Sequence, residues 1–353
     1  MTYRIAIAGL GQSARTIHLP AYKRIPALEI VGGCDPAAPP GQFAFPLFSS
    51  IPEMLNATKP HILAVATPPD SHFYIAKLGL ESDCHVFCEK PFMNDLSEAD
   101  AIIALSKERN KQVVVNNQFR CMRIHRAAKD KIGSPEFGKL LFLSMHQTFL
   151  VTEKTEAGWR GEDTRRTAKE FGTHVFDLCR FFFGEEPLSV CARMPRFGQP
   201  TGPDYLNLIQ LEFSGDRVAQ ITLDRVSRGR HRYLDIRLDG ELASIETSLG
   251  GRLEMRVGMQ ATARRPFFDL DLAPGGRARL YQGEQYSTLA TEPLNVFAGA
   301  TAELVTEFLA ALDRGQIPPC NALDNHRTLA LMLAAYESDA KRAPVIIRQH
   351  AHS

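Results

Sequence analysis

The chain has 353 residues, and its 41 lysine and arginine residues balance 40 aspartate and glutamate residues, giving a formal net charge of +1 at pH 7. Proteins that bind nucleic acid or anionic membrane surfaces concentrate positive charge, so this balance argues against both classes. The length predicts two domains, and a hydrophobic content of 44% can build a core in each. We therefore expect a globular protein with no nucleic-acid partner and no membrane partner.

Targeting signals and cysteine content favour the cytoplasm. Residues 1–10 lack the basic region and cleavage site of a signal peptide, and the densest apolar run, residues 329–335, is too short to span a bilayer. Seven cysteines is an odd number, which predicts no disulfide framework. Strand alternation places His85 on the opposite face from Cys84 and Cys88, so we interpret these three as core residues and predict no metal site.

Up to residue 121, short apolar runs alternate with segments of helical spacing. The runs are nearly continuous, as in parallel strands covered on both faces. They span residues 4–10, 28–35, 62–67, 85–90 and 112–118. Helices are expected over residues 71–80 and 97–109, the second opened by Ser97. This alternation predicts an α/β domain over residues 1–121, a Rossmann-type doubly wound parallel sheet.

One crossover of this sheet should be irregular. The segment 36–46 contains four prolines and one glycine. Proline removes a backbone donor and breaks a helix interior, so no helix is expected there.

Residues 122–353 show a different pattern, with longer segments that alternate apolar and polar residues. Such segments are typical of half-buried antiparallel strands. Strands are expected over residues 140–148, 205–213, 218–226 and 233–248, and helices over residues 168–183, 297–314 and 323–341. The second domain is therefore predicted to be α+β, with a large, mainly antiparallel open sheet. An open sheet face is often covered by a second subunit, which predicts a homo-oligomer, a dimer or a tetramer.

Gly9, Gly11 and Ala14 form a GxGxxA turn directly after the first expected strand. There, the first glycine permits a tight turn, the second lets the backbone approach a pyrophosphate, and the small third residue lets the helix pack on the strand. Asp35 ends the second strand, where a carboxylate accepts hydrogen bonds from the ribose of NAD and repels the 2′-phosphate of NADP. No lysine or arginine occurs in residues 36–48 to bind that phosphate. The turn predicts a dinucleotide site that prefers NAD; a structural turn with an unrelated aspartate is the alternative.

Lys90 lies between Glu89 and Pro91 at the end of the fourth expected strand, the sheet edge where α/β folds bind ligands. Pro91 fixes the turn, and Glu89 supplies a carboxylate that can position the amine. A solvated surface lysine is the alternative interpretation.

Glu170, His174 and Asp177 fall on one face of the expected helix at 168–183, at spacings of four and three residues. Histidine is the usual general acid or base near neutral pH, and a carboxylate one turn away can orient its ring. A solvated helix face is an equally simple interpretation. Metal binding by these three residues ranks low, because Lys90 would be an unsuitable neighbour for a cation.

Further polar candidates follow the third and fifth strands and occupy the loop before this helix. Trp159, the only tryptophan, lies in a charged loop with glycine nearby, where sugar stacking or a lid role competes with simple core packing. The candidates are Thr67, Pro68, Pro69, Asp70, His72, Asn117, Gln118, Arg120, Trp159 and Arg160.

Together these motifs resemble the glucose-fructose oxidoreductase, inositol dehydrogenase and MocA-like (Gfo/Idh/MocA) oxidoreductases over essentially the whole chain. The motifs are the GxGxxA turn with His18-Leu19-Pro20, Asp35-Pro36, Thr67-Pro68-Pro69-Asp70 with His72, Glu89-Lys90-Pro91, Arg120, Trp159-Arg160, and the helix with Gly172, His174 and Asp177. The resemblance implies a Rossmann domain followed by an α+β domain, a nicotinamide cofactor, and hydride exchange with a hydroxyl-bearing carbon, commonly of a sugar or cyclitol. It implies an acid/base role for His174 and contact of Lys90 with both the substrate hydroxyl and the nicotinamide ribose.

On this basis we expect an NAD-dependent dehydrogenase. Its catalytic residues would be Lys90 and His174, with Glu170 orienting the histidine. The expected cofactor-binding residues are Gly9, Gly11, Gln12, Ser13, Ala14, Asp35, Thr67, Pro69, His72, Glu89, Lys90 and Gln118. The expected substrate-binding residues are Lys90, Arg120, Trp159, Arg160, Arg166, His174 and Asp177.

The sequence departs from the family pattern before the histidine, where Arg165, Arg166 and Thr167 precede Glu170. The two arginines would suit an acidic sugar or a phosphate-bearing substrate. Two other functions stay open. One is a non-catalytic NAD-binding regulatory protein; the other is a reductase or lyase that acts on a C=C or C=N bond or through a transient oxidation.

Overall fold

The computed structural model describes residues 2–39, 41–152, 155–156, 161, 163–199, 202–229, 231–259 and 264–347. The chain divides into two compact units. Unit 1 contains Met1–Cys121, Ala168–Leu178 and Phe297–Glu337, and unit 2 contains Met122–Thr167, Cys179–Val296 and Ser338–Ser353. The first segment of unit 1 ends at Cys121. Beyond it, helical segments that we placed in the second domain belong to unit 1.

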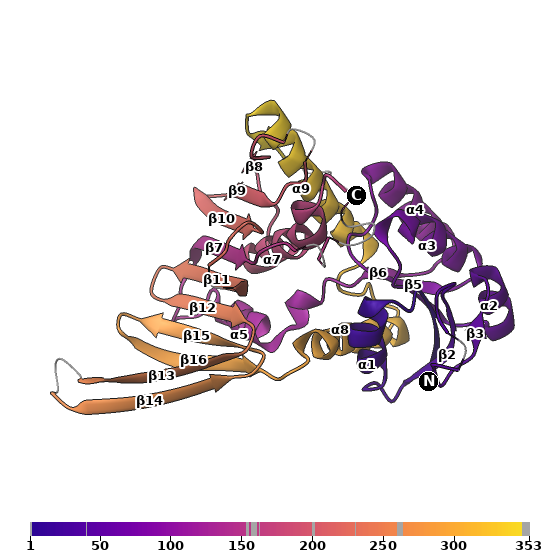
Figure 1. The fold of residues 1–353 in the computed structure, drawn as a ribbon, viewed down its shortest axis with the longest axis horizontal. Coiled ribbons are helices and arrows are strands. Elements are labelled where there is room, and N and C mark those ends of the chain that lie inside the picture. The colour runs from indigo at the N-terminus through magenta and orange to yellow at the C-terminus, as the bar shows by residue number, and fades with distance from the viewer. Residues whose placement is uncertain are drawn as a thin grey trace. The chain divides into compact units, whose positions relative to one another are not determined.

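Unit 1 is built on a sheet of six parallel strands (Figure 1). The strands are β1 (Tyr3–Ala8), β2 (Leu28–Cys34), β3 (Leu47–Phe48), β4 (Ile62–Val65), β5 (His85–Cys88) and β6 (Val113–Val115). Five of them were predicted, and the two-residue β3 was not. Their order, β3-β2-β1-β4-β5-β6, reverses direction between β1 and β4. This is the Rossmann order, in which the crevice at the reversal point binds the ligand.

Helices cover both faces of this sheet. On one face, α3 (His72–Glu81) brings Gly79 so close to Leu63 and Val86 that an added Cβ would lie within 3.2 Å of each. On the other face, Phe308 of α8 (Val296–Asp313) stacks on Phe87, which alternates with Val86 along β5. This contact explains why a late segment of the chain joins unit 1.

The other helical elements of unit 1 agree largely with the predicted positions. Asp95, rather than the predicted Ser97, caps α4, because its carboxylate accepts a hydrogen bond from the Glu98 amide at 2.9 Å. The described residues of segment 36–46 form no helix, as predicted. The elements, the last two of which extend a few residues into unit 2, are η1 (Ala14–His18), α1 (Leu19–Tyr22), α2 (Ile51–Thr58), η2 (Pro69–Ser71), α4 (Leu96–Glu108), η3 (Gln118–Cys121), η4 (Ala168–Gly172), α7 (Thr173–Phe183) and α9 (Ala322–Lys341).

Unit 2 contains a nine-stranded sheet of order β16-β15-β12-β11-β7-β10-β9-β8-β17 (Figure 1). Its strands are β7 (Leu140–Thr148), β8 (Ser189–Arg193), β9 (Leu206–Phe213), β10 (Arg217–Asp224), β11 (Arg232–Gly240), β12 (Ser244–Leu249), β15 (Gly276–Gln282), β16 (Gln285–Glu292) and β17 (Val345–Ile346). The helix α5 (Arg123–Lys131), which was not predicted, packs against β15 and β16.

One detail of this sheet differs from the prediction. The segment 233–248 is two strands, since a turn closed by the hydrogen bond from Gly240 N to Ala243 O separates β11 from β12. The alternating pattern continues across this short turn and concealed it. The sheet is mainly antiparallel, as predicted, and includes a parallel pair, β7 with β10.

A separate two-stranded sheet extends unit 2. It consists of β13 (Arg252–Met259) and β14 (Pro266–Ala273), which pair antiparallel. In the part of the chain that the structure describes, no helix combines the length and the hydrophobicity needed to cross a bilayer.

Candidate active site

The glycine turn after β1 has the geometry that its motif predicts. Gly9 has a φ of 88°, and a Cβ there would lie 2.6 Å from the carbonyl oxygen of Ala66, so only glycine fits. At Gly11, no described atom outside the glycine and its two chain neighbours lies within 4 Å of where a Cβ would be. The backbone at Gly11 is therefore open to a ligand. Ala14, fully buried, lets the following helix pack on the sheet.

Asp35 is held beside this turn. Its carboxylate accepts hydrogen bonds from the backbone amides of Leu10, at 2.7 Å, and Ala37, at 2.8 Å. A carboxylate offers about four acceptor positions, so each oxygen can accept a further hydrogen bond from a ribose hydroxyl. The open backbone at Gly11 and the fixed acid at the end of β2 fit the pyrophosphate and the ribose of a dinucleotide.

Thr67, Pro69 and His72 follow β4 at the reversal point of the sheet. The His72 ring is fully buried between two backbone carbonyl oxygens, that of Thr67 at 3.0 Å from Nε2 and that of Pro91 at 2.9 Å from Nδ1. Burial lowers the pKa of His72, although both carbonyls favour its charged form. His72 thus joins the turn after β4 to the turn after β5, and its ring nitrogens are engaged by the protein.

Glu89 is the centre of a buried polar cluster under Lys90. One carboxylate oxygen is 2.7 Å from Nε2 of His18 and 2.8 Å from the Asn116 amide nitrogen. The hydroxyl of Ser13 lies 3.5 Å from the same oxygen, and the other oxygen accepts from the backbone amide of Lys90 at 3.2 Å. Burial opposes ionisation, but the His18 and Asn116 hydrogen bonds and nearby positive charge outweigh it and lower the pKa of Glu89 to about 2. Glu89 therefore stays ionised and fixes the backbone that carries Lys90.

Lys90 reaches from the end of β5 to the π-helical turn η4. Its ammonium donates a hydrogen bond to the backbone carbonyl of Glu170 at 2.9 Å. π-Helical turns are frequent at functional sites, because the wider turn changes which backbone groups a helix presents. The same turn alters the regular spacing of Glu170 and His174 that the sequence predicted. The predicted catalytic residues Lys90, Glu170 and His174 are nevertheless brought together in unit 1.

His174 is held chiefly by aromatic rings. Its ring stacks on Phe119, with ring centroids 4.0 Å apart and planes within 2°, and Phe171 packs against it edge-on at 5.9 Å. Nδ1 is buried and has no hydrogen-bond partner among the described residues. Burial, and secondarily the charge of Lys90, lower the pKa of His174 well below its usual range, while Glu89 and Glu170 oppose this shift. The imidazole is therefore neutral at pH 7 and can accept a proton.

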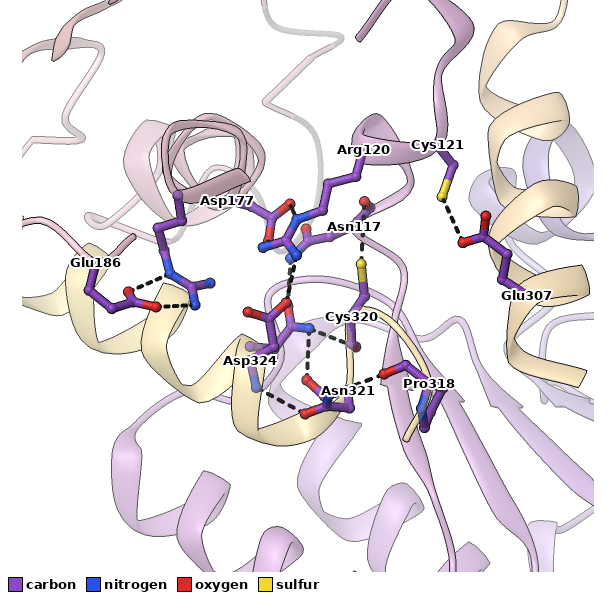
Figure 2. A network of polar contacts seen from close by, with 12 residues as sticks. Asn117, Arg120, Cys121, Asp177, Glu186, Glu307, Pro318, Cys320, Asn321 and Asp324 are labelled. Atoms are coloured by element: carbon purple, nitrogen blue, oxygen red, sulfur yellow. Dashed lines mark hydrogen bonds and ion pairs between the residues drawn. The ribbon is translucent and has the colours of Figure 1, made fainter. Parts of the chain in front are cut away.

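Arg120 and Asp177, both predicted to bind substrate, bind each other (Figure 2). The two groups form a bidentate ion pair, with Nε–Oδ2 and Nη2–Oδ1 distances of 2.6 Å. Asp324 of α9 adds a second ion pair to Arg120 at 2.8 Å. Burial disfavours the charge on Arg120, but the two carboxylates raise its pKa nonetheless. This network connects η3, α7 and α9 beside His174.

Gln118 and Asn117 lie in the same region. The side-chain oxygen of Gln118 is buried and has no hydrogen-bond partner in the described structure, as expected of a group that awaits a ligand. Asn117, in contrast, donates to Asn325 at 2.5 Å.

Three predicted substrate residues, Trp159, Arg160 and Arg166, precede η4 in the sequence. Arg166, in unit 2, is buried, and its guanidinium forms two hydrogen bonds of 3.0 and 3.1 Å with the carboxylate of Glu156. The guanidinium of Arg166 is therefore paired with an acidic side chain of the protein. Trp159 and Arg160 lie outside the described residues.

Several residues of the site were missed by sequence reasoning. Phe119 carries no polar signal, and Asn116 and Asp324 reveal their roles only through partners far away in the chain. His18 was noted only as part of a motif, although it contacts Glu89 directly. Among the described residues, no group of three or more histidine, cysteine or acidic side chains could hold a metal ion.

Two family models match this chain. Residues 3–117 match the model of an oxidoreductase family with an NAD-binding Rossmann fold, and residues 125–246 match the model of the GFO/IDH/MocA C-terminal domain. The D-apiose dehydrogenase of Paraburkholderia graminis is 25% identical, over 95% of this chain and 87% of its own length. The levoglucosan dehydrogenase of Pseudarthrobacter phenanthrenivorans is also 25% identical, over 82% of this chain and 80% of its own length.

Solved structures share the whole fold. An oxidoreductase from Agrobacterium radiobacter, determined in complex with NAD+, L-tartaric acid and magnesium, covers 98% of both chains with a TM-score of 0.81 and 18% identity. The glycine turn, the strand order and the two family models lead to one conclusion: the chain belongs to the Gfo/Idh/MocA oxidoreductases and contains their NAD-binding Rossmann fold.

Proposed function

We propose that this protein is an NAD-dependent dehydrogenase that oxidises a hydroxyl-bearing carbon of a sugar, cyclitol or sugar acid. The observation that carries the proposal is the neutral, buried ring of His174. Its Nδ1 has no hydrogen-bond partner among the described residues, and the charge of Lys90 helps to lower its pKa. A neutral imidazole next to a fixed ammonium suits removal of a proton from an alcohol.

His174, Lys90 and Glu170 have separate roles in the proposed reaction. His174 accepts the hydroxyl proton, and Phe119 keeps the imidazole ring in one plane. Lys90, held by the Glu170 carbonyl and by the backbone that Glu89 anchors, keeps its positive charge near the developing alkoxide. Glu170 acts on His174 through its charge, because it opposes the lowering of the histidine pKa.

NAD, when bound, supplies the hydride acceptor. Gly9, Gly11 and Ala14 would shape the pyrophosphate site, Asp35 would bind the adenosine ribose, and Gln118 would offer its unpartnered oxygen. Gln12, Ser13, Thr67, Pro69, His72, Glu89 and Lys90 complete the proposed cofactor-binding set.

The preference for NAD over NADP is part of the proposal. The carboxylate of Asp35 repels a 2′-phosphate, and residues 36–48 contain no lysine or arginine that could bind one. The relatives named as apiose and levoglucosan dehydrogenases act on sugars, which favours a neutral sugar. We rank sugar acids second, because the guanidinium of Arg166 already pairs with Glu156.

We infer further that residues 1–121 bind the nucleotide and residues 122–353 contribute to substrate binding and to assembly as a homo-oligomer. An open sheet of nine strands is commonly covered in this way. None of the seven cysteines, all of which the structure describes, forms a disulfide, and six of them are buried, which suits a reducing compartment such as the cytoplasm.

The test is a panel of neutral sugars, cyclitols and sugar acids, each incubated with NAD or NADP while NADH or NADPH formation is followed by absorbance. We expect turnover of at least one neutral sugar or cyclitol, faster with NAD. Calorimetric titration with NAD runs in parallel. NAD binding without turnover of any compound would overturn the proposal in favour of a regulatory protein, and faster turnover with NADP would overturn the cofactor preference.

A further inference from the structure

The two-stranded sheet of β13 and β14 has one apolar face. Its cross-strand pairs include Leu253 with Leu272, Met255 with Leu270 and Val257 with Phe268. Side chains of alternate residues in a strand point to the same face, so these pairs lie on one side of the ribbon. The seven large apolar residues of that face are Leu253, Met255, Val257, Met259, Phe268, Leu270 and Leu272.

These seven residues are exposed, with relative accessibilities of 59–71%. At about two-thirds exposure each, they present on the order of 900 Å² of surface, more than the roughly 300–600 Å² of the largest apolar patch on an ordinary monomer. About 800 Å² per partner is the size of a standard stable interface. A two-stranded ribbon is also only marginally stable in water unless its apolar face is covered. The size and chemistry of this face therefore indicate an interface.

The apolar face requires an equally apolar partner surface. The nine-stranded sheet does not offer one, because the hollow of about 380 Å³ on its face is lined by Arg237, Glu246, Arg279 and other polar side chains. Other exposed large apolar residues of the described chain, such as Tyr74, Leu242 and Ile317, are scattered over separate elements.

A lipid surface also fits poorly. Residues 252–273 contain four arginines against three acidic residues, which is far from the basic composition of segments that bind anionic membranes. The surface that matches this face in length and lack of charge is the same face of another copy.

We propose that the apolar face of β13–β14 packs against the identical face of a second copy of this chain, around a two-fold axis. Such an interface is isologous, so each residue of the patch meets the patch of its partner. Two sheets stacked face to face lie about 10 Å apart and interdigitate their side chains, which removes both faces from water together. This contact gives the homo-oligomer proposed above a specific surface, and it does not depend on the proposed reaction.

The test measures the mass of the full-length protein in solution by light scattering and sedimentation over a dilution series. The variant is Val257→Glu with Phe268→Glu, a cross-strand pair within the ribbon. Matched controls are Leu242→Glu and Ile317→Glu, which lie outside the ribbon and are 61% and 77% exposed. We expect the wild type and both controls to form the same oligomer and the double variant to have half that mass. A monomeric wild type, or a double variant with the wild-type mass, would overturn the proposal.

Hydrogen exchange of the wild-type protein gives a second measurement that does not rely on a variant that folds. Amide protection in β13 and β14 should fall when the protein is diluted until it dissociates, while protection in β1 and β4 stays constant. Unchanged protection of the ribbon on dissociation would place the interface elsewhere. The protein should not co-sediment with vesicles of phosphatidylcholine and phosphatidylserine. If it is instead a monomer that binds these vesicles through the ribbon, the apolar face is a membrane-binding surface.

Discussion

Replacing Glu89 by glutamine tests the buried cluster that anchors Lys90. The cluster lowers the pKa of Glu89 from its usual 4.5 to about 2. Each pKa unit corresponds to about 1.4 kcal/mol, so the ionised carboxylate contributes on the order of 3 kcal/mol to folding. Because the folded-state pKa is the lower one, this contribution is present above about pH 4.5 and is lost as the pH falls toward 2.

The assay is urea denaturation followed by circular dichroism at a series of pH values. Glu89→Gln should lower the free energy of unfolding by about 3 kcal/mol at pH 7, and the difference from wild type should shrink below about pH 4.5. Glu108→Gln, at a side chain that is 71% exposed, is the control and should change stability little at any pH. A Glu89→Gln protein as stable as wild type at pH 7, or a difference that does not depend on pH, would refute the electrostatic reasoning.

Three further predictions concern the cofactor site and the base. Gly9→Ala should destabilise the fold and abolish NAD binding, since its Cβ would meet Ala66. Gly11→Ala should have the wild-type melting temperature but bind NAD more weakly. If thermal melts and calorimetry show the same effects for both variants, this distinction is wrong. Asp35→Ser should raise the ratio of NADP to NAD turnover, and an unchanged ratio would remove Asp35 from cofactor selection. The acidic limb of kcat/KM for alcohol oxidation should lie well below pH 6.5, because burial lowers the pKa of His174; a limb at or above pH 6.5 would exclude it as the base.

The parallel sheet could be predicted because its strands are continuous apolar runs, and this pattern depends only on local sequence. The two residues of β3 are too few to show any pattern. Strands β11 and β12 merged in the prediction, since the turn after Gly240 does not interrupt the alternation. Local periodicity thus predicts which segments are strands more reliably than where they turn.

The candidate site was predictable in composition but not in its pairings. Lys90 and His174 could be proposed from residue type and position. The ion pair of Arg120 with Asp177 joins residues 57 positions apart, and the stacking of Phe119 on His174 depends on tertiary packing. The sequence could therefore name both residues as candidates, but it could not show that they form an ion pair with each other.

The ribbon of β13 and β14 also shows that a local pattern does not predict burial. Leu253, Met255 and Val257 alternate along β13 as the residues of a half-buried strand do, yet all three are exposed. What covers an apolar face depends on other parts of the fold or on other molecules. The periodicity of one strand gives no information about either.

We propose that Lys90 and His174 act on the substrate, while most of the binding energy for NAD comes from the glycine turn and Asp35. Its most direct test compares Lys90→Ala and His174→Ala with wild type, in turnover of the substrate found by the panel and in NAD affinity by calorimetry. Lys77→Ala, at a half-exposed lysine of α3, serves as the control. We predict that each site variant loses at least about a hundredfold in kcat, as removal of a positioned proton-transfer group typically does, while NAD affinity stays close to wild type. Turnover near the wild-type rate in both site variants would contradict the account.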